Sequence, residues 1–460
     1  MLYVRHYGKD LTPYAEAIFK SHRVRLRVQK YDTMAEAPYY SVSRAPHQIR
    51  VLDQGLPSLY ERLRMIREAK YSIELESFEL GRDRSASLIL QALVERAKAG
   101  VRVRFLLDRS PGTAFPDENQ TGSLANAGLS FRFFNPYPGL NPAQLRNHRK
   151  LIIVDDRQAL LGGRNLSDQY FNIATTKKVY QDRDVWVKGP IVHRIRATFD
   201  RIWESPEALL WKNSDRPSSP WWQINRDSEG LRKWVEIGGQ REHAAIRTFD
   251  VDELIFASDR PGNCYRGRVT AGTLASYIKN AREEIWVENP YVILRGEVAE
   301  EIRAAVRDRH VAVNLVTNSR YSFDDEYLVL ANIMESELPG LVRSGMTVFG
   351  FAGKTWGGNP RSELHAKTMV IDRTTSIIGS ANLDPRSLEY NLELLLIVPN
   401  APAVAEALRE VTMTRARDSY RLGADGEYDH AGDSPLPRSK SAEFEAGWQN
   451  VMTYLFRGFF

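Results

Sequence analysis

The chain has 460 residues, 43% of them hydrophobic, which is enough for two or more domains with a core each. Its net charge of +5 and pI of about 9.0 suit an anionic partner, without choosing between a phospholipid surface and a nucleic acid. The single cysteine, Cys264, excludes an internal disulfide framework. No signal peptide and no apolar run of about 18 residues is present, so we expect a soluble or peripheral protein.

Residues 1–50 are expected to form an N-terminal extension. Within it, residues 22–30 alternate apolar and basic side chains, as a strand with one charged face does. A solvated face is favoured here over an anion-binding strip.

The first domain is expected over residues 51–212. Its strand–helix–strand order predicts parallel strands joined by a crossover helix. The expected elements are a helix over 59–68, strands over 71–79, 101–108 and 131–134, a helix over 85–98 capped by Ser85, a strand over 184–187 and a helix over 190–204. Residues 109–147 are rich in Pro, Gly, Asn and aromatic residues, and read equally well as a substrate loop or as a plain connection.

A linker over residues 213–245 separates this domain from a second one over 246–460. The tryptophans at 221 and 222 are expected to clamp the linker onto a domain rather than to touch a membrane. The second domain repeats the order of the first, with strands over 254–256, 284–291, 310–317, 347–351 and 391–397 and helices over 273–281, 297–308, 324–335 and 401–412. The apolar tail over 447–460 either docks on its own domain or enters the headgroup boundary of a bilayer.

One motif occurs once in each domain. The first copy is His148-x-Lys150-x4-Asp155, followed by a Gly-rich turn that ends in Asn165. The second copy has the same residue types at the same spacing, at His365, Lys367, Asp372 and Asn382. A single match should arise by chance in about one such chain in a thousand, so two matches in register are a poor fit to chance.

Strand geometry assigns different tasks to the motif residues. The apolar runs 151–154 and 368–371 predict buried strands. Residues two apart on a strand share a face, so each motif His and Lys point the same way. Asp155 and Asp372 lie an odd number of residues away and are expected to face elsewhere, in a structural role that bonds turn backbone or an internal Arg.

Two lysines, two asparagines and two histidines around one cleft predict a phosphodiester site. The Lys ammonium groups and the amides of Asn165 and Asn382 suit non-bridging phosphate oxygens. One imidazole can attack phosphorus while the other protonates the leaving oxygen. This chemistry requires no metal, and the sequence shows no ligand cluster of the usual spacing.

The motifs resemble those of the phospholipase D superfamily, whose signature is His-x-Lys-x4-Asp in two copies. Residues 162–170 and 379–387 are most similar to the corresponding turns of bacterial cardiolipin synthases, and the resemblance covers about residues 55–212 and 265–460. It implies an α/β fold of two fused, pseudo-two-fold related domains, each a mixed sheet flanked by helices, with the active site at their interface. The chain departs from the family after Glu76, where Ser-Phe-Glu replaces a Tyr-containing aromatic stretch.

The resemblance also implies the partners of the histidines. An acidic residue after each motif contacts the histidine of the opposite half, and the matching positions are Asp184 for His365 and Glu393 for His148. An ordinary strand-end carboxylate is the alternative for either acid. The family order makes His148 the nucleophile that forms a phosphohistidine and His365 the general acid and base, with an exchange of roles left open.

The implied function is transfer of a phosphatidyl group between phospholipids, as in cardiolipin synthesis, without a cofactor. The alternatives are a hydrolytic phospholipase D that releases phosphatidic acid, a nuclease, which is less favoured, and an inactive binding module, which the intact motifs disfavour. Expected partners are anionic phospholipids and the membrane surface, with no obligatory nucleic acid and a protein partner left open. We expect a monomer built as a fused pseudo-dimer, peripheral at the cytoplasmic face of the inner membrane.

Overall fold

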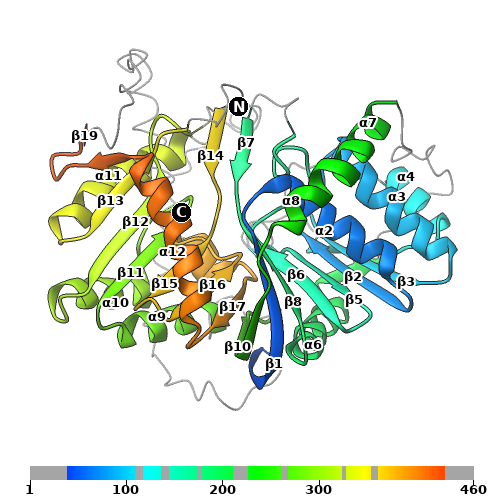
Figure 1. The fold of residues 1–460 in the computed structure, drawn as a ribbon, viewed down its shortest axis with the longest axis horizontal. Helices are drawn as coiled ribbons and strands as arrows, with labels where there is room; N and C mark the ends of the chain where they lie inside the picture. The colour runs from blue at the N-terminus through cyan, green and yellow to red at the C-terminus, as the bar shows by residue number, and fades with distance from the viewer. Residues whose placement is uncertain are drawn as a thin grey trace, which may run out of the picture. The chain divides into compact units, whose positions relative to one another are not determined.

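Two α/β halves of the chain contribute to one 17-stranded sheet (Figure 1). The structure is a computed structural model, and the residues that it describes belong to one compact unit. It describes residues 39–109, 116, 118–135, 145–173, 178–210, 226–261, 268–323, 328–353 and 361–429. The sequence-based prediction of an α/β fold with two related halves is confirmed.

The first half begins with β1 and ends with β9. Its elements are β1 (Tyr40–Leu52), α2 (Gly55–Glu68), β2 (Ser72–Ser77), α3 (Arg84–Lys98), β3 (Arg102–Asp108), α4 (Glu118–Asn126), β4 (Ser130–Phe134), β5 (Leu151–Val154), β6 (Gln158–Gly162), β7 (Lys178–Gln181), β8 (Asp184–Lys188), α6 (Ile191–Trp203) and β9 (Ala208–Leu210). In the sheet these strands follow the order β9-β4-β3-β2-β5-β6-β8-β1. As expected, β2 and β3 are parallel, with α3 as the crossover helix.

Three short helical segments precede the second half. They are α7 (Arg226–Trp234), the π-helix η1 (Val235–Gly239) and α8 (Gln240–Ala244). The second half holds β10 (Phe249–Ser258), α9 (Val269–Asn280), β11 (Glu284–Glu288), α10 (Gly296–Arg307), β12 (Ala312–Asn318), α11 (Leu328–Arg343), β13 (Thr347–Phe351), β14 (Arg361–Leu364), β15 (Thr368–Ile371), β16 (Thr375–Gly379), the π-helix η3 (Arg386–Tyr390), β17 (Leu394–Val398), α12 (Pro402–Arg417), β18 (Tyr420–Leu422) and β19 (Tyr428–Asp429). Its sheet order, β10-β17-β16-β15-β11-β12-β13-β18-β19, mirrors that of the first half.

The halves join edge to edge through their first strands. β1 pairs antiparallel with β10, from Tyr40 opposite Ala257 to Ile49 opposite Phe249. On their other sides β1 pairs with β8 and β10 pairs with β17. The sheet therefore includes part of the segment that was expected to be an extension. Strand β1 carries Ser, Arg and His among its apolar residues, and it forms through pairing with distant strands, which a local pattern does not reveal.

Two other details differ from the sequence-based expectation. The predicted linker is helical from residue 226 onward, because Leu231 and Val235 are buried in the apolar cluster that also holds residues of α2 and α3. Helix α3 begins two residues earlier than the Ser85 cap predicts. Its N-cap is Asp83, whose carboxylate accepts a hydrogen bond from the Ala86 N–H at 3.1 Å.

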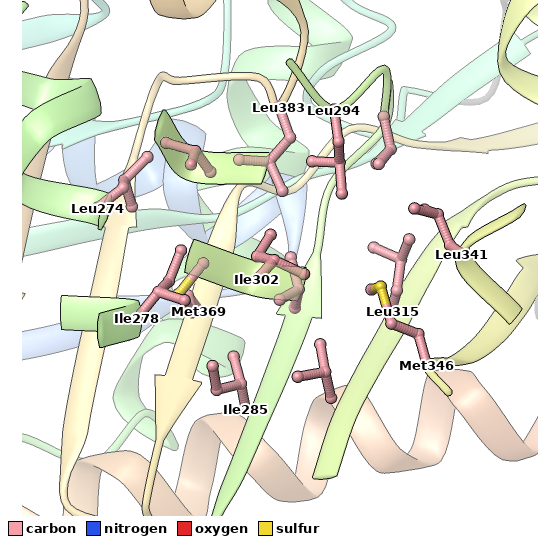
Figure 2. Packing of buried hydrophobic residues seen from close by; sticks show 14 of the residues in the cluster. Leu274, Ile278, Ile285, Leu294, Ile302, Leu315, Leu341, Met346, Met369 and Leu383 are labelled. Carbon is pink, nitrogen blue, oxygen red and sulfur yellow. The ribbon is translucent and has the colours of Figure 1, made fainter. Parts of the chain in front are cut away.

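Alternation along the motif strands separates the core into layers. In β5, Leu151 and Ile153 face a cluster shared by both halves and packed against α6 and α12, whereas Ile152 and Val154 face a cluster of the first half alone. The second half has its own cluster on the opposite face of the sheet, where α9 and α10 pack on β11 and β15 (Figure 2). Both motif strands are thus buried on two faces, which holds the residues before them rigidly.

Some expectations lie outside the described residues. These are the strand over 22–30, most of the loop over 109–147, the linker over 213–223 and the tail over 447–460. Among the described residues, no helix is both long enough and apolar enough to cross a bilayer.

Candidate active site

Both motif histidines lie where their halves meet, directly before a buried strand. His148 and Lys150 precede β5, and His365 and Lys367 precede β15. All four residues are at most 7% exposed. This position is consistent with the predicted interface site, and the contacts of each histidine come from the opposite half.

The His148 contacts reach the segment that leads into β17. The His148 N–H donates to the Leu392 carbonyl at 3.0 Å, and Nδ1 lies 2.9 Å from Oε1 of Glu393. An ionised carboxylate only accepts hydrogen bonds, so Nδ1 is the donor and the Nε2 lone pair is available for reaction. The predicted pair of Glu393 with His148 is present in the structure.

The His365 contacts are the counterpart in the other direction. The His365 N–H donates to the Gln181 carbonyl at 2.7 Å, and Nδ1 lies 2.6 Å from Oδ2 of Asp182. Strands β7 and β14, one from each half, pair in parallel beside this contact (Figure 1). In both cases the histidine backbone bonds to one residue of the other half and its ring to the next.

The prediction that Asp184 pairs with His365 is wrong. The Asp184 carboxylate accepts hydrogen bonds from Ser58 at 2.6 Å, Arg62 at 3.0 Å and Arg164 at 3.1 Å, all within the first half. Strand register explains the error. Gly162 of β6 is opposite Asp184, whereas Gly379 of β16 is opposite Leu395. The two glycines begin equivalent turns, so counting back two residues from each partner makes Asp182 the counterpart of Glu393.

The turn after each motif supports the acid of its own half. A Cβ on Gly163 would lie 2.1 Å from Oδ1 of Asp182, so only glycine leaves room for this carboxylate. The equivalent Ser380 instead donates through Oγ to Oε2 of Glu393 at 2.5 Å, and Ser387 donates to Oε1 at 2.6 Å. Glu393 therefore accepts hydrogen bonds from serine hydroxyls, whereas the equivalent position beside Asp182 is a glycine that leaves room for its carboxylate.

Each lysine is held by its own motif. Nζ of Lys150 donates to the His148 carbonyl at 2.6 Å, and Nζ of Lys367 donates to the His365 carbonyl at 2.5 Å. Burial lowers the pKa of Lys150 to about 7 and that of Lys367 to about 8. Two lysines whose pKa values lie near 7 to 8 give the site a positive potential when they are protonated, and this potential favours binding of an anionic phosphate.

Burial also lowers the pKa of both histidines, to about 4 for His148 and about 3 for His365. The field of the lysines adds to this effect across the halves, because Lys367 acts on His148 and Lys150 acts on His365. Both imidazoles are therefore neutral near pH 7. The charges of both motifs act on both rings, so the two motifs form one electrostatic site.

The motif aspartates lie away from the histidines, as strand parity predicts. The Asp155 carboxylate accepts from the backbone N–H groups of residues 70–72 at 2.7–2.9 Å. The Asp372 carboxylate accepts from those of residues 282–284 at 2.8–3.1 Å. Both residues have positive φ, 53° and 50°, and each one closes the turn before the neighbouring strand. This geometry fits a structural role.

The asparagines lie at the ends of their turns in different surroundings. Nδ2 of Asn165 donates to Oε2 of Glu79 at 3.1 Å and to the Tyr170 hydroxyl at 2.9 Å. Asn382 is buried, and its backbone N–H donates to Oγ of Ser387 at 2.8 Å. Contact of either amide with phosphate stays a prediction.

Aromatic side chains surround the two histidines unequally. Phe78 packs edge-on to His148 at 5.0 Å between ring centroids. Three tyrosines surround His365, with Tyr170 at 5.2 Å, Tyr180 at 5.1 Å and Tyr291 at 6.3 Å. The site is thus pseudo-symmetric in its catalytic groups and asymmetric in its walls.

Sequence reasoning missed Asp182, Ser380 and the tyrosines around His365. Ser380 carried a usable signal, because it occupies the second position of the turn, as Gly163 does in the first copy. Asp182 carried none, because the turn and the acid are separated by different distances in the two halves. Only the strand register reveals that equivalence.

Comparisons with known proteins agree with this architecture. The chain is 24% identical to Cardiolipin synthase 1 of Bacillus cereus over 374 residues, which cover 78% of this chain and 65% of that relative, slightly less than two thirds of its length. It is 26% identical to Cardiolipin synthase A of Pseudomonas syringae pv. syringae over 393 residues, covering 82% and 72%. Among solved structures, phosphatidylserine synthase of Haemophilus influenzae matches with a TM-score of 0.61 at 15% identity over 89% of this chain and 93% of that one, a likeness of fold.

A family match covers more than half of the chain and falls on both motifs. The family described as "Cardiolipin synthase, PLD-like domain" matches residues 63–203 and again residues 274–413. Each matched segment contains one His-x-Lys motif together with the strands that position it. The chain therefore belongs to the phospholipase D superfamily, in the family of cardiolipin synthase PLD-like domains.

Proposed function

We propose that the protein is a phosphatidyltransferase of the cardiolipin synthase type, which moves a phosphatidyl group between phospholipids through a phosphohistidine. The observation that carries this proposal is the crossed pair of contacts, His148 with Glu393 and His365 with Asp182. Each pair orients a neutral imidazole with Nδ1 as donor, the state required of a nucleophile. Family membership supports a phospholipid as the source of the phosphodiester.

In the first step, Nε2 of His148 attacks the phosphorus of the donor lipid. An N–P bond forms, and the bond from phosphorus to the headgroup oxygen breaks. His365 gives its Nε2 proton to that oxygen, so that the headgroup leaves as a neutral alcohol. In the second step, His365 takes the proton of an acceptor hydroxyl, whose oxygen attacks phosphorus and releases His148.

The lysines prepare His365 for the acid role. Burial and the field of the two lysines keep the pKa of His365 low, so it holds only the Nδ1 proton near pH 7. A bound phosphodiester is anionic and offsets that field, which raises the pKa of His365 and favours a second proton on Nε2. Substrate binding and formation of the acid are thereby coupled. The ammonium groups then stabilise the charge that develops on the non-bridging oxygens.

The test is a product assay on vesicles of phosphatidylglycerol and phosphatidylethanolamine, with products identified by mass spectrometry. We expect cardiolipin with released glycerol or ethanolamine from the intact protein and none from His148→Ala. The matched control is His193→Ala, because His193 is 73% exposed on α6 and pairs with Asp156 at the surface. Phosphatidic acid alone would move the assignment to a hydrolytic phospholipase D. No lipid turnover would refute the proposal and direct the search to nucleic-acid phosphodiesters.

The nucleophile is tested by trapping. Donor lipid labelled at phosphorus is mixed with the protein, quenched in denaturant at alkaline pH and digested. The label is expected on the peptide that contains His148. A label on the peptide that contains His365 would exchange the roles of the two histidines without removing the transferase.

A further inference from the structure

The strand register places an acidic residue of the first half where the second half has a tyrosine. Glu76 of β2 pairs with Leu151, and Glu288 of β11 pairs with Thr368. Leu151 and Thr368 each directly follow the Lys of their motif, so the two glutamates are equivalent. Three residues further on, Glu79 in the first half therefore corresponds to Tyr291 in the second.

Backbone contacts hold Glu79 against the turn that carries Asn165. The Glu79 carbonyl accepts a hydrogen bond from Oγ of Ser77 at 2.6 Å and from the N–H of Leu166 at 3.3 Å. The next residue, Leu80, forms a parallel bridge with Leu166. The position of this residue is thus fixed by the same turn that follows the first motif.

The Glu79 side chain differs from the other acids of the site. Asp182 and Glu393 are fully buried and hold histidines, and Glu363 is buried and pairs with Lys178 at 2.9 Å. Glu79 is open to solvent, and its carboxylate accepts from the Asn165 amide, a neutral donor. A carboxylate so placed retains capacity to accept hydrogen bonds from a ligand.

The surroundings of Glu79 favour a neutral ligand over a cationic one. Although Glu79 is exposed, the protein atoms around its carboxylate desolvate it in part and raise its pKa, whereas Lys150, the Asn165 amide, Lys178 and the Tyr170 hydroxyl lower it. A carboxylate that sits in the field of two lysines attracts an ammonium group less strongly than an isolated one does. A hydroxyl group carries no net charge to be repelled, and it donates a charge-assisted hydrogen bond to a carboxylate.

From this placement we infer that Glu79 selects the alcohol of the reaction, by accepting a hydrogen bond from a hydroxyl that does not react. The ligand class is a polyol with at least two hydroxyl groups, one that is bound to phosphorus or attacks it and one that contacts Glu79. Glu79 acts on the leaving and the acceptor alcohol alike, because both occupy the same position relative to phosphorus. This inference rests on the proposed transferase function.

A competition between two acceptors tests the inference in one sample. Full-length protein is given phosphatidylglycerol vesicles with equal concentrations of deuterated glycerol and 1-propanol, which lacks the second hydroxyl. Mass spectrometry gives the ratio of deuterated phosphatidylglycerol to phosphatidylpropanol. We expect Glu79→Leu to lower this ratio about tenfold, since a site built to bind a hydroxyl discriminates through it, and Glu79→Gln to lower it less. Because the readout is a ratio, a change in the amount of active protein does not affect it.

The matched control is Glu95→Leu, because Glu95 is exposed on α3 and its carboxylate accepts a hydrogen bond from Gln91 on the same helix. Its ratio is expected to equal that of the unaltered protein. An unchanged ratio in Glu79→Leu would overturn the inference while the transferase stands. A folded Glu79→Leu protein that forms neither product would assign Glu79 to the chemical step and overturn it as well. An unaltered protein that forms neither product would refute the transferase, and the inference with it.

Discussion

Two single variants, Asp182→Asn and Asp184→Asn, are expected to have opposite effects. The first should lower kcat, and the second should lower the free energy of unfolding. Asp182 holds His365 at 2.6 Å, whereas Asp184 neutralises Arg62 and Arg164, which are at most 4% exposed. In Asp182→Asn the amide offers a hydrogen to Nδ1 and favours the tautomer whose proton lies on Nε2. By this route we expect kcat to fall about 10²- to 10⁴-fold, with little change in the free energy of unfolding.

Asp184→Asn has the opposite expected profile. Two buried guanidinium groups lose their counter-charge, which costs about 3–5 kcal/mol of the free energy of unfolding. The folded fraction keeps its His365 contact and its kcat. Both variants are compared by initial rates of lipid transfer per folded molecule and by denaturant midpoints. Loss of kcat at unchanged midpoint in Asp184→Asn, with a fully active Asp182→Asn, would refute the assignment.

Three further predictions concern charge, space and the structural turns. As pH rises through about 7 to 8, kcat/KM should fall, because Lys150 and Lys367, with pKa values lowered to about 7 and about 8, lose the charge that binds phosphate; a pH profile still rising above this window would contradict it. Gly163→Ala places a Cβ 2.1 Å from Oδ1 of Asp182 and should lower kcat, while the free energy of unfolding stays within about 1 kcal/mol of the original value. An unchanged kcat would show that the turn shifts to accommodate the methyl group. Asp372→Ala leaves three backbone N–H groups without their acceptor and should lower the free energy of unfolding by about 1–3 kcal/mol at unaltered kcat per folded molecule; an unaffected denaturant midpoint would argue against the structural role.

Much of the fold was predictable because its determinants are local. The motif strands are short apolar runs, and the helices over 85–98 and 297–308 have apolar faces with helical spacing, so each was expected close to its observed bounds. Strand β1 was not expected, because its residues become a strand only by pairing with β8 and β10. Such pairing depends on contacts across more than 130 positions of sequence, which no window of neighbouring residues contains.

The site, like the fold, was predictable only where its determinants are local. Repetition identified the histidines, the lysines and the structural aspartates, because each half confirms the other. The partner of His365 was not predictable by counting, because the segment between the Asn165 turn and β8 includes β7, which the second half lacks at that point. The family resemblance favoured Asp184, whereas the geometry selects Asp182.

The edge-to-edge junction of β1 with β10 has the form of a symmetric dimer contact, in which equivalent strands of two subunits pair antiparallel. In a dimer of identical chains, every substitution appears on both sides of the axis at once. Fusion into one polypeptide removes that constraint, so each side can change alone. The chain shows such changes at Gly163 against Ser380, Asp182 against Glu393 and Glu79 against Tyr291. Fusion into one chain thus permits the two histidines to take the different duties that we propose for them.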